Sequence, residues 1–423
     1  MDTRDKYDSA RSHCERRNPI VSETTAPLFA VAETKPAAFD LASDRGVRSA
    51  AIEFCDTLPY REAPYARRNW GAPLHSLCSY QGKLKPAIAH FLVRLFTAPG
   101  DVVLDPMAGV GTIPLEARLQ QRTGVAGDLS ELAAVVSRAK LEGFGADEVR
   151  TVMTELAQAV ATDDESDATL IEEEHGAFGL NGPVKDYFEQ RTLREVLLAR
   201  RFFRPRVDDP SPAEAVVLTG LLHILHGNRP YALSRCSHPV TPFKPTGVAE
   251  YRPVIAGLAR RLSSVLGPLG ALPSDGRAFR SDYGKLPLDA GSIDAVITSP
   301  PFAHSLRFFS TNWMRLWFCG WGPDDFHRRP QDFLERKQRT SFADSYRSFL
   351  ESMHRVLRPD GLLIMHLGET RRLNMAEEIA PLLADRFSVI HVGRECVADT
   401  ESHGLSDKGA TLAHGFVFAR ALH

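Results

Sequence analysis

The sequence predicts an α/β protein whose open, doubly wound sheet is interrupted by a mostly helical insert. Three observations point to this fold class. Residues 101–122 have the pattern of a short buried strand, a glycine turn and a helix, the first unit of such a fold. Residues 294–302 (DAVITSPPF) have the pattern of a buried strand that stops at two prolines. Between them, residues 145–277 break the regular alternation of strands and helices.

The composition is typical of a soluble globular protein. The chain has 423 residues, of which 43% are hydrophobic and 25% charged, and a net charge of −2, so any nucleic-acid binding must come from a local patch. No apolar run is long enough to span a membrane and no signal peptide is evident, which predicts a cytoplasmic protein without a membrane partner. The six cysteines are scattered without a CxxC pair, which favours reduced thiols over disulfides or a metal site. The oligomeric state is not readable from the sequence.

The first 66 residues are polar and lack sustained periodicity, which predicts a loosely ordered N-terminal arm. A helix is expected to begin at Pro86, because apolar residues then recur at helical spacing. The polar residues just before it, Tyr80, Gln81 and Lys83, are candidates for lining a ligand site. The alternative is that they only pack against the next strand.

The glycine turn after the strand Asp101–Leu104 is the first candidate binding element. Gly109 and Gly111 allow a ligand to approach the backbone closely, but the pattern is GxG rather than GxGxxG or GxxxxGK[ST], which argues against a dinucleotide or a triphosphate. Asp105 opens the turn, where it would repel phosphate and attract a cationic group such as an α-ammonium. Asp128 ends the next short strand, about 20 residues further on, where such folds place a ribose-binding carboxylate. A solvated aspartate is the alternative.

Two segments further along are basic. Asn228–Arg252 is irregular because of its prolines and mixes basic with aromatic residues, as nucleic-acid contact surfaces do. Phe326–Thr340 is predicted to be a second basic loop beside the site. The candidate nucleic-acid contacts are Arg229, Tyr231, Arg235, Lys244, Arg328 and Arg329. A helical cap without a binding role is the alternative for the insert.

The remaining elements complete the predicted sheet. Phe279–Leu286 returns to it and places Asp282 at a strand end, as a third acidic residue at the rim of the site. The aromatic residues of 308–321 are predicted to be core. The expected later strands are Leu362–Leu367, Phe387–Val392 and Gly415–Ala419, the last of them antiparallel.

The strand end at TSPPF is the second candidate binding element. Carboxyl ends of strands are where open α/β sheets bind ligands. This one presents the Ser299 hydroxyl, backbone carbonyls freed from the sheet by the prolines, and the aromatic face of Phe302. Those groups suit a flat ring that bears an amino group. An ordinary proline-rich loop is the alternative.

Four motifs in this order resemble one family: DPMAGVGT at 105–112, GD at 127–128, SD at 281–282 and TSPPF at 298–302. They resemble the S-adenosylmethionine-dependent amino-methyltransferases, specifically the N4-cytosine/N6-adenine DNA methylase family, with its Rossmann-like methyltransferase sheet. Met107 and Ala108 depart from the usual cofactor motif, and the serine of TSPPF favours the N4-cytosine branch. The segment 79–93 resembles the helix-opening motif of the family.

The resemblance implies a division of the chain and a set of site residues. Residues 67–144 would form the cofactor-binding half, 145–277 the inserted target-recognition domain, and 278–423 the catalytic half. Binding of S-adenosylmethionine would fall to Tyr80, Lys83, Asp105, Pro106, Met107, Gly109, Gly111, Thr112, Asp128, Leu129, Asp282 and Tyr283. The target-base pocket would be formed by Ser299, Pro300, Pro301 and Phe302, without a metal.

The expected activity is direct methyl transfer to an exocyclic amino group of a DNA base, most simply cytosine N4. The base would be flipped out of the duplex into the pocket at TSPPF. Two alternatives use the same scaffold: an N6-adenine DNA methyltransferase, and an amino-methyltransferase that acts on tRNA or rRNA. A catalytically silent module that binds nucleic acid is the alternative of a different class.

Overall fold

In the computed structural model, the described residues are 39–67, 70–80, 82–238, 241–267, 272–303, 308–396 and 411–422. Most of the predicted N-terminal arm, residues 1–38, therefore lies outside the described residues, and so does Gln81. No helix of the described part is long and apolar enough to cross a membrane.

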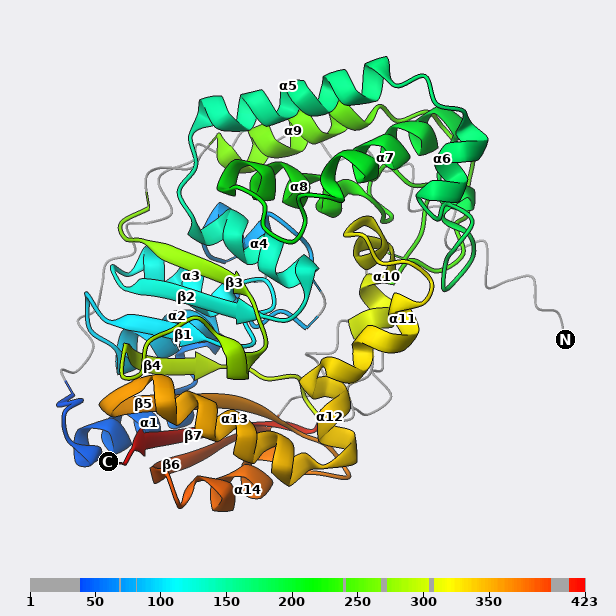
Figure 1. The fold of residues 1–423 in the computed structure, drawn as a ribbon. Coiled ribbons are helices and arrows are strands. Elements are labelled where there is room, and N and C mark those ends of the chain that lie inside the picture. Colours follow the sequence, from blue (N-terminus) through cyan, green and yellow to red (C-terminus); the bar gives the residue numbers. More distant parts are fainter. Residues whose placement is uncertain are drawn as a thin grey trace, which may run out of the picture. The chain divides into compact units, whose positions relative to one another are not determined.

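Within the described residues, seven strands form one sheet in the order β3-β2-β1-β4-β5-β7-β6 (Figure 1). Their bounds are β1 Val102–Asp105, β2 Thr123–Asp128, β3 Gly276–Arg280, β4 Ile293–Thr298, β5 Leu357–Glu369, β6 Phe387–Cys396 and β7 Ala413–Ala421. Strand β7 runs antiparallel to both of its neighbours, and the other adjacent strands pair in parallel. The order reverses between β1 and β4, which makes the sheet doubly wound. The predicted fold class and the antiparallel last strand are confirmed.

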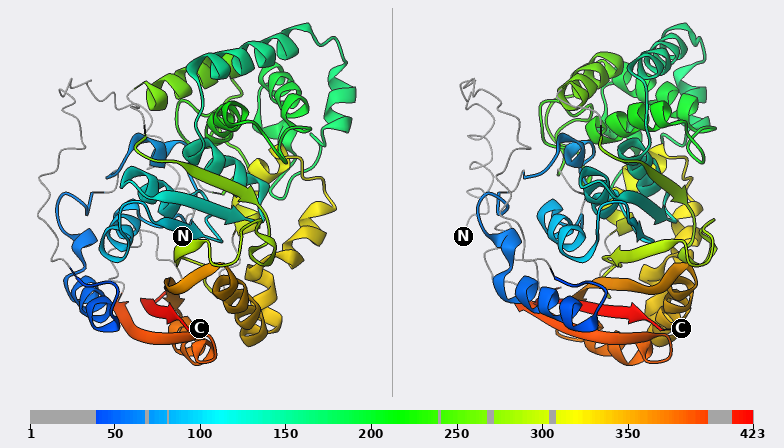
Figure 2. Two further views of the ribbon diagram at one scale, coloured as in Figure 1. Left: turned by 60° about the vertical axis from the view of Figure 1, so that its left-hand side comes forward. Right: turned by 90° about the vertical axis from the view of Figure 1, so that its left-hand side faces the viewer.

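Helices cover both faces of this sheet (Figure 2). Helices α1, α2 and α3 pack on one face, where β1 contributes Val103, and helices α13 and α14 pack on the other, where β1 contributes Leu104. The bounds are α1 Asp44–Thr57, α2 Pro86–Phe96, α3 Thr112–Leu119, α4 Glu131–Leu141, α10 Phe308–Phe318, α11 Asp325–Arg328, α12 Leu334–Thr340, α13 Phe342–Val356 and α14 Met375–Ile379. Short 3₁₀ helices lie at Pro59–Arg61, Pro73–Ser76, Val184–Tyr187, Tyr283–Lys285, Arg329–Asp332 and Ala380–Leu383.

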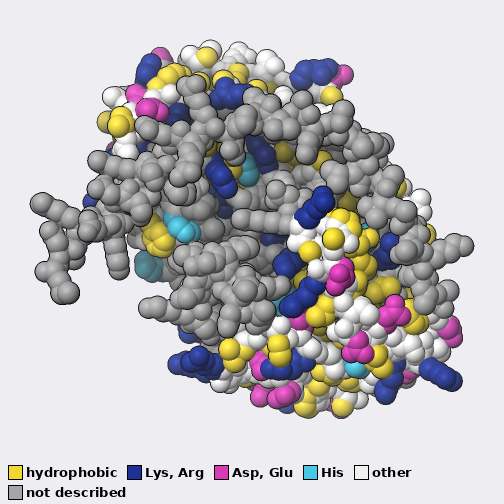
Figure 3. Space-filling model, turned by 180° about the vertical axis from the view of Figure 1, so that it is seen from behind, with side chains coloured by type: hydrophobic (Ala, Val, Ile, Leu, Met, Phe, Trp, Pro, Cys, Tyr) yellow, Lys and Arg dark blue, Asp and Glu magenta, His cyan; other side chains and the backbone are white. Residues whose placement is uncertain are grey.

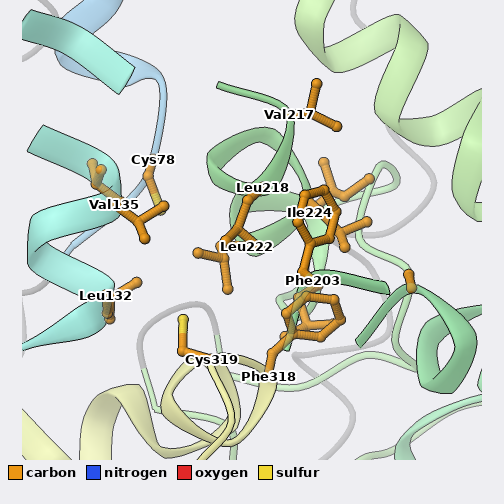
Figure 4. Close-up of a cluster of buried hydrophobic side chains, with 14 of the residues drawn as sticks. Cys78, Leu132, Val135, Phe203, Val217, Leu218, Leu222, Ile224, Phe318 and Cys319 are labelled. Carbon is orange, nitrogen blue, oxygen red and sulfur yellow. The ribbon is translucent and has the colours of Figure 1, made fainter. Parts of the chain in front are cut away.

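The insert is helical, as predicted. Its helices are α5 Ala146–Thr162, α6 Asp167–Glu173, α7 Gln190–Phe203, α8 Pro212–Ile224 and α9 Val254–Leu266. Figure 4 shows how α8 joins it to the rest: Leu218 and Leu222 point toward Leu132 and Val135 of α4. This packing fixes the insert on the helix that follows β2. Its predicted role in target recognition stays a prediction.

One correction concerns the end of the predicted arm. Residues 44–57 form the helix α1 and are not loosely ordered. Val47, Ala50, Ala51 and Phe54 recur at helical spacing and are fully buried, so the helix is held by an apolar stripe. The periodicity is short and sits between polar residues, which is why composition alone missed it.

A second correction concerns Phe326–Thr340, which is helical and not a basic loop, because it contains most of α11, a 3₁₀ turn and α12. The neighbouring aromatic segment behaves as predicted. Trp313, Trp317 and Trp321 are fully buried, which confirms that these aromatics are core.

Candidate active site

The two candidate binding elements meet at one edge of the sheet. Strands β1 and β4 are parallel neighbours, with Leu104 opposite Val296. At their carboxyl ends, the Thr298 hydroxyl donates a hydrogen bond of 2.7 Å to Oδ1 of Asp105. The glycine turn after β1 and the prolyl corner after β4 therefore start side by side, at the point where the strand order reverses. This is where doubly wound sheets bind ligands.

The glycine turn needs its glycines for both conformation and space. Gly109 and Gly111 have positive φ angles of 53° and 66°. A Cβ atom on Gly111 would lie 2.9 Å from Oγ of Ser137, and one on Gly109 would lie 3.6 Å from the ring of Tyr80. The turn is also tied down from α4, because Nζ of Lys140 donates to the Val110 carbonyl at 2.5 Å. The result is a fixed backbone turn with the Tyr80 ring beside it.

Asp128, at the end of β2, holds the glycine turn from its other side. Its Oδ2 accepts the Gly109 N–H at 2.9 Å, and its Oδ1 accepts the Ser130 N–H at 2.9 Å. Burial raises the pKa of this carboxyl to about 6. A carboxylate has about four lone-pair sites and Asp128 accepts from the N–H groups of Gly109, Leu129 and Ser130, so acceptor capacity remains for the predicted ribose-binding role.

Asp105 is a buried carboxyl group, with 3% of its surface exposed. It accepts from the Thr298 hydroxyl and, at 3.2 Å, from the Met107 N–H. Burial raises its pKa to about 7, and no cationic side chain among the described residues forms an ion pair with it. A carboxylate in such a place would be stabilised by a cation from outside the chain, and the predicted contact with an α-ammonium group stays a prediction.

The other predicted cofactor residues fall into two groups. Pro106, Met107 and Thr112 belong to the turn and the first residue of α3, and Leu129 follows Asp128. Asp282, at the end of β3, accepts from the Gly284 N–H at 2.9 Å and lies 3.3 Å from Nζ of Lys337. Two residues have other partners: the Lys83 ammonium donates to the His75 carbonyl, and Tyr283 is buried against Phe349. Direct contact with a cofactor stays a prediction for all the residues in both groups.

The TSPPF corner is held from two elements that the sequence analysis did not connect with it. Oγ of Ser299 lies 3.0 Å from Nδ1 of His366 on β5. From α12, Nε2 of Gln338 donates to the Pro301 carbonyl at 3.2 Å. Pro300 is buried, and the half-buried ring of Phe302 lies 5.6 Å from the His366 ring. The four predicted pocket residues thus lie in one corner that is held by hydrogen bonds from β5 and α12, and their role as a base pocket stays a prediction.

Helix α12 also carries a buried acid that the sequence analysis missed. Glu335 is 5% exposed, and burial raises its pKa to about 7. Burial raises the pKa of Tyr80, and the charges of Asp128 and Glu335 add to this effect. No local motif marks Glu335, because α12 meets the site only in the folded chain.

The candidate nucleic-acid contacts differ in exposure and in whether their side chains already have partners within the protein. Tyr231 is 50% exposed, and Arg229 and Lys244 are exposed. Arg235 donates to the Gly247 and Asp186 carbonyls and so stabilises its own loop. Arg328 and Arg329 form ion pairs with Asp325, and Arg329 also contacts Glu131.

Within the described part of the chain, no group of three His, Cys, Asp or Glu residues is placed to hold a metal ion.

Comparison with known protein families gives a match for one part of this chain. Residues 75–169, which include the glycine turn and Asp128, match the family described as RMKL-like, methyltransferase domain. No protein of curated function matches the sequence.

Among solved structures, TrmN from Thermus thermophilus is 15% identical with a TM-score of 0.33; the match covers 83% of this chain and 52%, about half, of TrmN. A SAM-dependent methyltransferase from Methanosarcina mazei is 10% identical with a TM-score of 0.30, covering 78% of this chain and 97% of that one. The rRNA methyltransferase aviRa from Streptomyces viridochromogenes is 15% identical with a TM-score of 0.27, covering 85% and 96%. Scores this low carry no argument about substrate.

The fold and the family match agree with each other. The matched segment contains α2, β1, the glycine turn, β2 and α4. The seven-stranded sheet around it has the parallel strands, the antiparallel β7 and the covering helices described above. The chain therefore has a Rossmann-like methyltransferase fold, in which residues 75–169 are similar to a methyltransferase domain.

Proposed function

We propose that this protein uses S-adenosylmethionine to methylate an exocyclic amino group of a nucleic-acid base. The observation that carries the proposal is the hydrogen bond between Thr298 and Asp105. It joins the turn suited to the cofactor to the corner suited to an amine, so both groups would be bound at the same strand ends. The family match to residues 75–169 supports the cofactor half of this reading.

The described residues fit the cofactor. When bound, S-adenosylmethionine supplies a methyl group on a positively charged sulfur, which keeps the carbon–sulfur electron pair as the methyl group leaves. Asp105 offers a buried carboxylate for the cationic methionine end, and the glycine turn, whose Gly109 is only partly buried, offers backbone without a side chain of its own. Asp128 offers oxygen lone pairs for ribose hydroxyls. The ring of Tyr80 lies beside Gly109 and would close this side of the site.

The TSPPF corner would act on the amine. The Ser299 hydroxyl oxygen and the Pro300 carbonyl would accept N–H bonds from the amine, which favours a tetrahedral nitrogen with its lone pair free for attack. The nitrogen becomes more positive as it attacks, so fixed acceptors stabilise the transition state more than the ground state. The Phe302 ring would stack on the base, which offsets part of the free energy needed to unstack it.

The identity of the base and of the polymer is the finer part of the proposal. The N4-cytosine reading depends on the serine of TSPPF, and N6-adenine remains its alternative in DNA. RNA is the other polymer that the same scaffold can serve, so RNA and DNA are tested side by side. The modified nucleoside identifies the base in either case.

The decisive experiment is a transfer assay with labelled S-adenosylmethionine and three substrates: total RNA, duplex DNA and single-stranded DNA. We expect S-adenosylhomocysteine to form and mass spectrometry of the digested polymer to show an N-methylated base. Ser299→Ala should lower kcat about 100-fold, a loss of the size seen when one fixed acceptor or donor is removed, while cofactor affinity stays within about twofold. A wild-type protein that forms no S-adenosylhomocysteine with any of the three would contradict the proposal.

The contact surface for the polymer is proposed to include the loop between α8 and α9. On the face that Figure 3 shows, basic and acidic side chains are interspersed, in keeping with the net charge of −2. The loop differs: residues 228–252 contain four Arg or Lys residues and one acidic residue. The half-exposed Tyr231 ring stacks on His223 at 5.2 Å, and Nδ1 of His223 accepts the Ser79 N–H next to Tyr80. These contacts link Tyr231 to the segment of Tyr80, and we infer that a neighbouring base stacks on the exposed part of the Tyr231 ring.

Tyr231→Ala is therefore expected to weaken binding of a single-stranded oligonucleotide about tenfold, because one stacking contact is lost. Tyr251→Ala is the matched control. That ring lies in the same loop, but its hydroxyl donates to Glu195 and its face is covered by the Arg191 guanidinium. Fluorescence anisotropy with a labelled oligonucleotide measures both affinities, and equal losses would argue against a stacking role for Tyr231.

A further inference from the structure

The hydroxyl of Ser299 has a partner that no motif in the sequence marks. Strand β5 pairs with β4 in parallel, with Met365 opposite Thr298, so the next residue on each strand comes together beyond the last pair. These two residues are Ser299 and His366, and Oγ lies 3.0 Å from Nδ1. The contact joins the proposed amine acceptor to the centre of the sheet.

His366 is held in one place by its surroundings. It is 4% exposed, and its ring lies 5.6 Å from Phe302, 5.0 Å from Phe416 and 4.6 Å from His414. Its other nitrogen, Nε2, has no hydrogen-bond partner among the described residues. Among the described residues, Ser299 is thus the hydrogen-bond partner of this imidazole.

The imidazole is neutral at physiological pH. Burial lowers the pKa of His366 to about 3, and the neighbouring His414 on β7 adds to this effect, while the more distant Glu395 on β6 opposes it. A neutral imidazole carries one hydrogen, so one of its nitrogens must be an acceptor. Such a group can direct a hydroxyl, but it is a poor general base.

We propose that His366 is a positioning residue whose Nδ1 accepts the Ser299 hydroxyl hydrogen and thereby turns the oxygen lone pairs toward the target amine. An unrestrained serine hydroxyl rotates, and it can donate as well as accept. An amine that is about to be methylated offers only N–H donors to its surroundings. With its own hydrogen bound to Nδ1, Oγ faces the amine as an acceptor alone. The inference rests on the proposed function, since it concerns the amine side of that reaction.

The role of His366 is limited to orientation. It does not act as a base, because an imidazole with a pKa of about 3 stays neutral at pH 7 and takes up no second proton. The proton of the newly methylated nitrogen leaves to water, so the balance of the transfer is the same with or without His366. His366 changes the fraction of time in which the Oγ lone pairs face the amine. This fraction affects kcat rather than the affinity for the cofactor.

Three substitutions separate orientation from packing. His366→Asn keeps a polar atom where Nδ1 lies, because the two side chains match as far as that atom. His366→Gln moves the polar atom to the position of Nε2, and His366→Leu removes it. We expect Asn to keep kcat within about threefold, and Gln and Leu to lower it about 10- to 100-fold, with the Kd for S-adenosylmethionine unchanged in all three. Thermal melting of each variant reports on the fold.

A second measurement needs no turnover. In protein labelled with ¹⁵N-histidine, the two ring nitrogens of each neutral imidazole have distinct shifts, and comparison with His366→Asn assigns those of His366. We expect the hydrogen on Nε2, a neutral ring from pH 8 down to pH 5, and a shift of Nδ1 when Ser299 is changed to Ala. A hydrogen on Nδ1, or a charged ring at pH 7, overturns the inference.

The outcomes distinguish the inference from the function on which it depends. If the wild type methylates nucleic acid and the three variants have equal kcat, or if Asn is as impaired as Leu, His366 does not orient Ser299. If the wild type methylates nothing, the proposed function fails, and this inference fails with it.

Discussion

Asp105→Asn should abolish most of the affinity for S-adenosylmethionine. The substitution keeps the shape of the side chain, and its carbonyl oxygen can still accept from Thr298 and Met107. It removes the buried negative charge that we assign to the cationic methionine end. Because losing one partner of a buried charge pair is strongly unfavourable, we expect the Kd to rise about 100-fold at pH 8. Isothermal titration calorimetry measures this directly.

The same substitution should stabilise the protein without ligand. A carboxyl group whose pKa rises from 3.8 to about 7 on folding lowers the free energy of unfolding by about 4 kcal/mol at pH 8. The raised pKa means that the stability is present below pH 3.8 and is lost as the pH rises through 7. Asp105→Asn should therefore raise the stability most at pH 8, and less at pH 5, where the folded carboxyl group is protonated.

Asp289→Asn is the control, because it makes the same chemical change at an exposed position. Urea denaturation at pH 5 and pH 8 compares the two variants with the wild type. A variant at 105 that binds S-adenosylmethionine as tightly as the wild type would remove the assignment of the ammonium group to Asp105. A variant without the gain at pH 8 would instead show that the carboxyl is better solvated than its burial indicates.

Local sequence patterns predicted the elements whose function depends on backbone shape. A few consecutive residues determine the backbone conformation of the turn at Gly109 and Gly111 and of the prolyl stop after Thr298. Both could therefore be predicted from the local sequence. The parallel-sheet rule then predicted that they share an edge, and the Thr298–Asp105 contact confirms it.

The residues that support the site could not be read in this way, because they come from distant parts of the chain. His366 is 67 residues from Ser299, and Gln338 is 37 residues from Pro301. Neither has a neighbouring residue that marks its partner, and register alone decides which β5 residue follows the Met365–Thr298 pair. The helix α12 was obscured in the sequence by its basic residues, which suggested a loop.

Gly368→Ala should impair methyl transfer through steric contact with the base pocket. Gly368 lies on β5, and a Cβ atom there would come within 2.5 Å of Cγ and Cδ2 of Phe302 and 3.0 Å of its Cβ. Contacts this short cannot be kept, so the aromatic ring must move from the place where the proposed target base stacks. We expect kcat to fall about 10- to 100-fold, as for other small displacements of a positioned group, with the Kd for S-adenosylmethionine unchanged.

Gly143→Ala is the matched control, because a Cβ atom there meets nothing within 4 Å. The transfer assay gives kcat for both variants, and thermal melting shows whether each is folded. The cofactor half lies on the β1 side of the sheet, so an effect of Gly368→Ala on kcat alone would locate the defect on the amine side. If a folded Gly368→Ala variant turns over like the wild type, the Phe302 ring does not form the wall of the base pocket, because the substitution cannot leave that ring where it is.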